Sequence, residues 1–172
     1  MFAKLQWDID QFDEIQREMP DIAEPLGFAA INVCISASSL RNWTVAAFIQ
    51  RRRSEGKPVR ERDVVNHIYA HVQQQKMCED IANTAKHSGF AEREWPGGSV
   101  SINFDEATEG SPGGYVLRHL HQNGKITSIA LNAFAAMEGC WWGELQNLGF
   151  PFPNTPPEWR RRKLAAAFGD GR

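Results

Sequence analysis

Three polar side chains share one face of a predicted long helix, close to its C-terminal end. Asp80, Asn83 and His87 stand at positions i, i+3 and i+7, so successive helical turns bring them to one side. A carboxylate can orient an imidazole as a general base, and an amide can stabilise an oxyanion or hold a water molecule. These three residues are therefore our first catalytic candidates. The alternative is a structural cluster, because buried polar groups usually satisfy one another.

Two histidines lie one turn apart earlier in the same segment. His67 and His71 have the i, i+4 spacing at which two imidazoles on a helix can bind one metal ion. The HExxH motif is not formed, since Ile68 stands where that motif has its glutamate. In a continuous helix, Cys78 would lie roughly 16 Å along the axis from His67, too far to bind the same ion. We therefore expect two partly exposed histidines, no metal site and no cofactor.

The segment from Arg62 to His67 has the spacing Arg-x4-His. It resembles the catalytic signature of HEPN (higher eukaryote and prokaryote nucleotide-binding) domains. The resemblance implies a helical domain with metal-independent ribonuclease activity, RNA as the partner, and a homodimer that brings two Arg/His pairs together. In that chemistry Arg62 would stabilise charge on the phosphorus centre, and His67 would transfer the proton of a ribose 2′-hydroxyl.

Two further motifs resemble those of a loose group of uncharacterised bacterial α+β proteins. Leu40 to Trp43 matches a Leu-x-[Asp/Asn]-Trp element, and Asp80 to His87 matches a helix end of the form Asp-x-Ala-Asn-x-x-Lys-His. The resemblance covers most of residues 26–149 and implies a mainly helical fold with a small sheet, without a particular activity. Asn42 stands where an aspartate is common, so a reaction that needs a carboxylate there is not supported.

Composition and charge point to one globular domain inside the cell. The chain has 172 residues, of which 42% are hydrophobic, enough for one substantial core. Its formal net charge of −2 provides no general attraction to nucleic acid or acidic membranes. The three cysteines, Cys34, Cys78 and Cys140, lie far apart and form no CxxC motif. Free thiols of this kind indicate a reducing, cytoplasmic location.

Neither export nor membrane insertion is expected from the N-terminal third of the sequence. Trp7, Asp8 and Asp10 interrupt the region where a signal peptide has its apolar run. The most apolar segment, residues 28–49, contains Arg41 and several serine and asparagine residues. This polar content predicts a buried or partner-packed helix and no membrane association.

Hydrophobic periodicity predicts about four helices. They cover residues 10–19, 26–53, 60 or 61–87, and 131–148, with glycine after the last two. For the second segment, a strand over 31–35 followed by a helix from Ser39 is the competing interpretation.

Alternating residues predict a small sheet before the last long helix. Val100, Ile102 and Phe104 alternate with polar residues, and Asn123-Gly124 separates two further strand segments, 115–121 and 125–130. The fold class is therefore α+β, mainly helical, with a three-stranded antiparallel meander.

We expect one domain over residues 1–172. It comprises a helical part (8–90), the meander (98–130), a closing helix (131–149) and a proline-rich, basic tail (150–172) with a short helix over 158–168. The function that we expect is that of a bacterial cytoplasmic binding or scaffolding protein, in which the Asp80, Asn83 and His87 cluster either locks the fold or forms a contact site. The alternative is the HEPN-like ribonuclease, and a third interpretation is a small-molecule pocket near Trp95 and His119.

Overall fold

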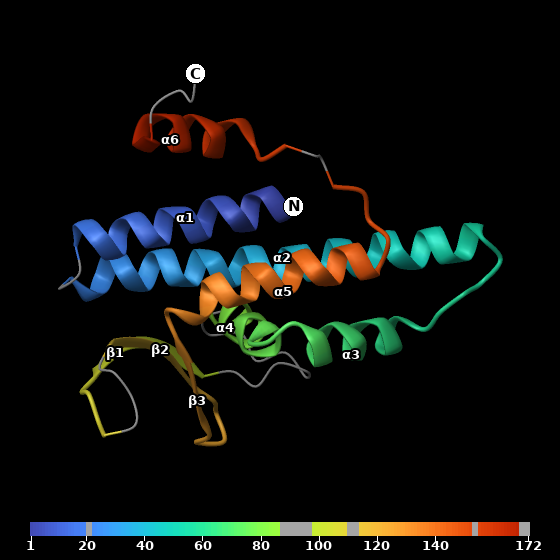
Figure 1. Ribbon diagram of the computed structural model, residues 1–172. Helices are drawn as coiled ribbons and strands as arrows, with labels where there is room; N and C mark the ends of the chain where they lie inside the picture. Colours follow the sequence, from blue (N-terminus) through green and yellow to red (C-terminus); the bar gives the residue numbers. More distant parts are fainter. Residues whose placement is uncertain (20–21, 87–97, 110–113, 153–154, 169–172) are drawn as a thin grey trace.

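The computed structural model describes residues 1–19, 22–86, 98–109, 114–152 and 155–168 (Figure 1). These residues form six helices and three strands. In chain order they are α1 (Phe2–Glu18), α2 (Ala23–Ser54), α3 (Glu61–His71), α4 (Gln75–Lys86), β1 (Ser99–Asp105), β2 (Gly114–Leu120), β3 (Ile126–Ala130), α5 (Ala133–Asn147) and α6 (Glu158–Phe168). The α+β class is confirmed, whereas the expectation of about four helices was too low.

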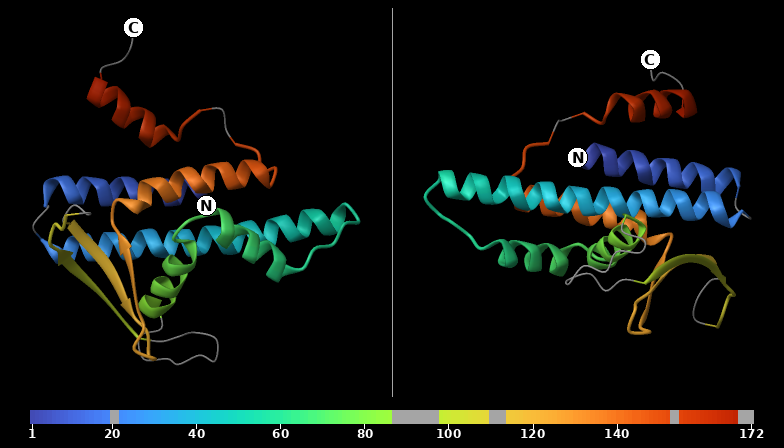
Figure 2. Two further views of the ribbon diagram at one scale, coloured as in Figure 1. Left: turned by 60° about the horizontal axis from the view of Figure 1, so that its bottom comes forward. Right: turned by 180° about the vertical axis from the view of Figure 1, so that it is seen from behind.

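The longest element, α2, lies at the centre of the fold. It is one uninterrupted helix of 32 residues, so the alternative of a strand over residues 31–35 is wrong. Pro25 falls in its first turn, where the missing N–H costs no hydrogen bond. Three consecutive residues of α2, Ser36, Ala37 and Ser38, are buried although they point about 100° apart around the helix, because α1, α4 and β1 pack around it (Figures 1 and 2).

The length and hydropathy of α2 are also those of a helix that could cross a membrane. However, 56% of its most apolar stretch is buried against the rest of the protein, and a central core helix meets the same criteria. This property of α2 is therefore only weak evidence for a membrane span.

The predicted single helix over residues 60 or 61–87 is wrong, because the chain leaves helical geometry at residues 72–74. Val72 has extended backbone angles, and Gln74 has a φ of 66°. Val72, within the break, and Gln75, directly after it, are both buried. Because of the break, α3 and α4 run in different directions (Figure 2).

The predicted meander is confirmed. The strands pair antiparallel in the order β1-β2-β3, with Ile102 opposite Leu117 and Leu117 opposite Ile129. Gly124 has a φ of 79°, as a tight turn after Asn123 requires. Leu117 and Ile129 are fully buried, and the sheet packs on α2 and α4.

The last two helices pack differently: α5 contacts both α1 and α3, whereas α6 lies at the periphery. In α5, Phe134, Met137 and Trp141 are fully buried, so this helix closes the core as predicted. The C-terminal helix α6 has the predicted bounds, but none of its residues is buried. It lies above α1, at the outside of the fold (Figure 1).

Candidate functional site

The structure describes two of the three residues in the predicted polar cluster of α4. Asp80 and Asn83 are each half-buried, and the Asp80 Oδ1 atom lies 2.6 Å from the Nζ atom of Lys76 on the preceding turn. His87 lies outside the described residues, as does Trp95. The side-chain contact that is described for Asp80 lies within α4. A functional role for the cluster stays a prediction.

Arg62 and His67 both lie on α3 and are exposed. Five residues of helix separate them by roughly 140° around the helix axis. His67 turns instead toward α5, where its Nε2 atom lies 3.1 Å from the Oε1 atom of Glu144. The predicted catalytic role of Arg62 and His67 is untested by this geometry.

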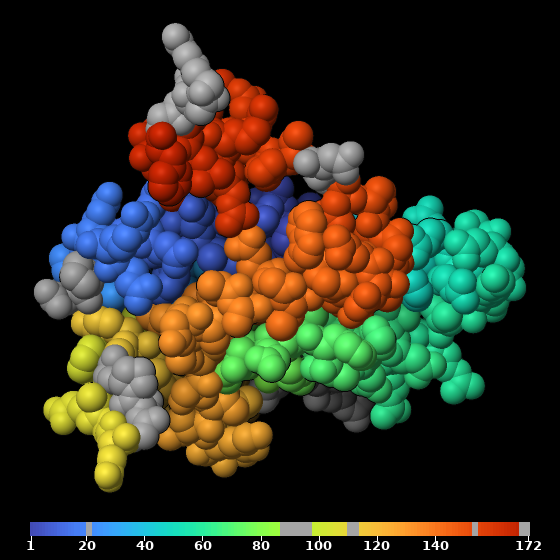
Figure 3. Space-filling view, viewed as in Figure 1, coloured from blue at the N-terminus to red at the C-terminus, as the bar shows by residue number. Residues whose placement is uncertain are grey.

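A cavity of about 840 Å³ lies between the N-terminal part of α1, one face of α5 and the C-terminal segment. Its walls come from α1 (Met1, Phe2, Ala3 and Gln6, with Met1 at the helix N-cap), α2 (Trp43), α5 (Ala135, Glu138, Gly139, Trp142 and Leu145), and the tail (Phe150, Pro151, Phe152, Thr155, Pro156, Pro157, Arg160 and Leu164). Figure 3 shows α6 lying against α1, and the C-terminal segment forms one side of the cavity. We call this cavity the tail pocket.

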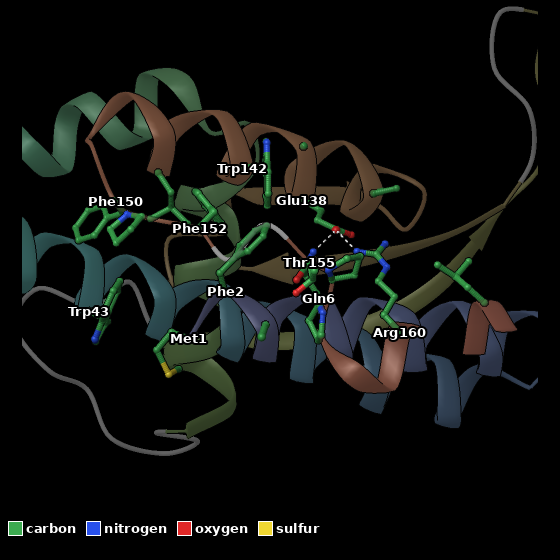
Figure 4. A pocket seen from close by; sticks show the side chains of 18 residues that line it. Met1, Phe2, Gln6, Trp43, Glu138, Trp142, Phe150, Phe152, Thr155 and Arg160 are labelled. Carbon is green, nitrogen blue, oxygen red and sulfur yellow. Dashed lines mark hydrogen bonds and ion pairs between the residues drawn. The ribbon is translucent and has the colours of Figure 1, made fainter. Parts of the chain in front are cut away.

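One end of the tail pocket is aromatic (Figure 4). The rings of Phe2, Trp142 and Phe152 contact one another, with centroid distances of 5.9 Å, 5.6 Å and 4.1 Å among the three pairs. Trp43 and Phe150 add a second ring pair at 5.4 Å. Trp43 and Trp142 remain 47% and 41% exposed, so their faces are not fully covered by protein and can contact a ligand.

The opposite end of the tail pocket is polar (Figure 4). The Oε1 atom of Glu138 accepts a 2.8 Å hydrogen bond from Gln6 Nε2 and a 2.9 Å hydrogen bond from Arg160 Nη1. These three residues come from α1, α5 and α6. The charges of Glu138 and Arg160 compensate each other, while the guanidinium has further N–H donors that can bind a ligand.

The helix α6, which forms one wall of the tail pocket, is held against α1 by interactions at the protein surface. Lys163 Nζ lies 2.6 Å from Asp10 Oδ2 and 2.7 Å from Glu14 Oε1. The Trp159 ring meets Trp7 edge-on at 5.1 Å. The hydrogen bond from Lys163 lowers the pKa of Glu14 below its ordinary value, so the carboxylate form is favoured while α6 is docked.

A second cluster joins α3 to α5. One ligand atom from each of His67, His71 and Glu144 lies within 4.8 Å of the other two. The sequence indicates the histidine pair, but it gives no signal for Glu144, which comes from a helix about seventy residues later. Only the folded chain brings this carboxylate to the two imidazoles.

The tail pocket was also missed from the sequence. The sequence predicts that its aromatic residues belong to the core or to an extended tail, because aromatic-rich segments can pack in many ways. The opposite charges of Lys163 and of Asp10 and Glu14 are the available signal for the docking of α6. That signal is weak, since charged residues are common on any protein surface.

Comparison with known proteins yields no relative. No family model matches the chain, and no match is found among curated proteins or solved structures.

Proposed function

We propose that this protein binds a small aromatic molecule that carries one uncharged hydrogen-bonding group, and that the binding site is the tail pocket. The observation that carries the proposal is the pairing of an aromatic end with a polar end in one cavity. A volume of about 840 Å³ lies within the range of small-molecule sites. The proposal retains the binding role expected from the sequence but moves the site from α4 to α1, α5 and α6.

The chemistry of the walls supports this class of ligand. Phe2, Trp142 and Phe152 offer ring faces and edges against which a planar apolar molecule can stack. At the other end, Glu138 and Arg160 neutralise each other, so a charged ligand would find no uncompensated partner there. A neutral donor or acceptor could bond to the carboxylate or to the remaining guanidinium N–H groups.

The polar end also favours binding over catalysis. One oxygen of the Glu138 carboxylate already accepts hydrogen bonds from Gln6 and Arg160. Because this oxygen is occupied, Glu138 is a poor general base. We further propose that the protein acts in the cytoplasm, because its three cysteines are free thiols.

Fluorescence titration with N-phenyl-1-naphthylamine tests the proposal. This probe is a neutral aromatic molecule with a single N–H donor, and its emission rises in an apolar environment. We expect saturable binding to the wild-type protein. Gly139 lines the pocket and has open space where a Cβ would stand, so Gly139→Leu should fill the cavity and weaken binding at least tenfold.

Gly143→Leu provides the matched control. Gly143 lies on the same helix, also has open space around its Cβ position, and does not line the pocket. Both substitutions replace a helical glycine and should raise helix stability by a similar amount, about 1 kcal/mol or less. Equal probe binding by the two variants would refute the tail pocket as the site.

A further inference from the structure

We propose that His67, His71 and Glu144 form a binding site for a divalent transition-metal ion, for which zinc is the appropriate probe. The two histidines come from α3 and the glutamate comes from α5. This site is separate from the tail pocket: Glu144 lies six residues beyond Glu138 and therefore roughly 120° around α5. Its test does not depend on ligand binding in the pocket.

The distances suit a single ion. The three ligand atoms lie within 4.8 Å of one another, and the distance from His67 Nε2 to Glu144 Oε1 is 3.1 Å. In a tetrahedral zinc site with nitrogen and oxygen ligands about 2.0–2.2 Å from the metal, neighbouring ligand atoms are about 3.3–3.6 Å apart. Small side-chain rotations would therefore close the three atoms around an ion.

The orientation of His71 is already that of a metal ligand. Its Nδ1 atom lies 2.8 Å from the backbone carbonyl oxygen of His67. A carbonyl oxygen only accepts hydrogen bonds, so Nδ1 carries the proton. In the neutral ring, Nε2 is then free to bind a metal ion, and a backbone carbonyl on the other nitrogen is a common partner of metal-bound histidine.

The environment of Glu144 is a second observation in favour of a metal site, independent of the distances between the ligand atoms. Its side chain is only 1% exposed, and within the described part of the chain neither carboxylate oxygen accepts a hydrogen bond of normal geometry. A buried carboxylate directed at two imidazoles calls for a positive partner, and a bound cation would provide it.

The ligand set selects the kind of ion. Two imidazoles and one carboxylate suit zinc and neighbouring transition metals, whereas magnesium and calcium prefer oxygen ligands alone. Three protein ligands leave a further coordination position, and the side chain of His67 is 45% exposed. Solvent or a small ligand could therefore occupy that position, as in catalytic zinc sites.

Competition titration with a chromogenic chelator tests the site on full-length protein without an affinity tag. We expect one equivalent of Zn²⁺ to bind, and Mg²⁺ not to displace it. His71→Ala and Glu144→Gln should each weaken zinc binding about 100-fold or more, since loss of an outer-shell partner alone typically costs 10–100-fold. Co²⁺ bound in place of zinc should show visible d–d absorption that both variants lose.

Glu61→Gln is the matched control, because it makes the same change at an exposed position of α3, the helix that carries both histidines, outside the cluster. It should bind zinc like the wild type. His71 is exposed, so its replacement should leave the folded state intact, which circular dichroism without metal would verify. The proposal is overturned by wild-type protein that binds no zinc, by unchanged affinity in Glu144→Gln, or by an equal loss in Glu61→Gln.

Discussion

Gln75 joins three helices through one buried side chain. It is fully buried directly after the break between α3 and α4. Its Nε2 atom donates a 3.3 Å hydrogen bond to the Ala37 carbonyl oxygen in α2, and its Oε1 atom accepts a 2.9 Å hydrogen bond from Trp141 Nε1 in α5. The amide therefore satisfies polar groups that would otherwise be buried without a partner.

Trp141→Phe removes the indole donor and leaves Gln75 Oε1 buried without its partner. We expect the free energy of unfolding, measured by urea titration, to fall by about 1–3 kcal/mol from the lost hydrogen bond, with a further loss from the smaller ring. Trp142→Phe, at the neighbouring and half-exposed position, should cost clearly less. Equal losses in the two variants would show that the bond to Gln75 contributes little.

At the scale of elements, the break between α3 and α4 depends on Gln74. Its φ of 66° lies in the left-handed region, which costs a residue with a Cβ roughly 1 kcal/mol or more relative to glycine. Nothing in the local sequence indicates this conformation, because neither glycine nor proline interrupts residues 61–86.

Gln74→Gly should therefore stabilise the protein, by up to about 1 kcal/mol, whereas Gln74→Val should destabilise it. Guanidinium titration of both variants measures the difference. Gln73→Gly is the control, since Gln73 is also exposed but has no positive φ. A stabilising Gln73→Gly, or a destabilising Gln74→Gly, would argue against strain at position 74.

Helices and strands that have a local signal could be predicted from the sequence, whereas contacts between elements far apart in the chain could not. The hairpin at Asn123-Gly124 and the helix over 158–168 follow from turn chemistry and from the proline-rich segment before the helix. The sequence contains the residues of both sites, but Glu144 reaches His67, and Arg160 reaches Glu138, only through the packing of α5. No periodicity encodes such long-range pairings.

At the scale of the whole molecule, the docking of α6 should depend on pH through Glu14. The folded-state pKa of this carboxyl is lowered by Lys163 from an ordinary value of 4.5. Its contribution to docking is therefore complete above pH 4.5 and is lost as the pH falls through the lowered value. We expect α6 to be released in acid before the core unfolds.

Limited proteolysis of the C-terminal segment would measure this release. At neutral pH, Glu14→Gln should increase cleavage after the basic residues of α6, while Glu18→Gln, on the same helix outside the described contacts of Lys163, should not. High salt should act in the same direction as Glu14→Gln, because these charges are near the surface. Cleavage that is independent of Glu14 would show that the aromatic contact between Trp7 and Trp159 is sufficient.

The absence of buried residues in α6 has a kinetic consequence. A molecule held beneath this helix can escape when a few ion pairs and one ring contact separate, with the central helices undisturbed. Residence time in the cavity would then vary with ionic strength, while the melting temperature of the domain stays nearly constant.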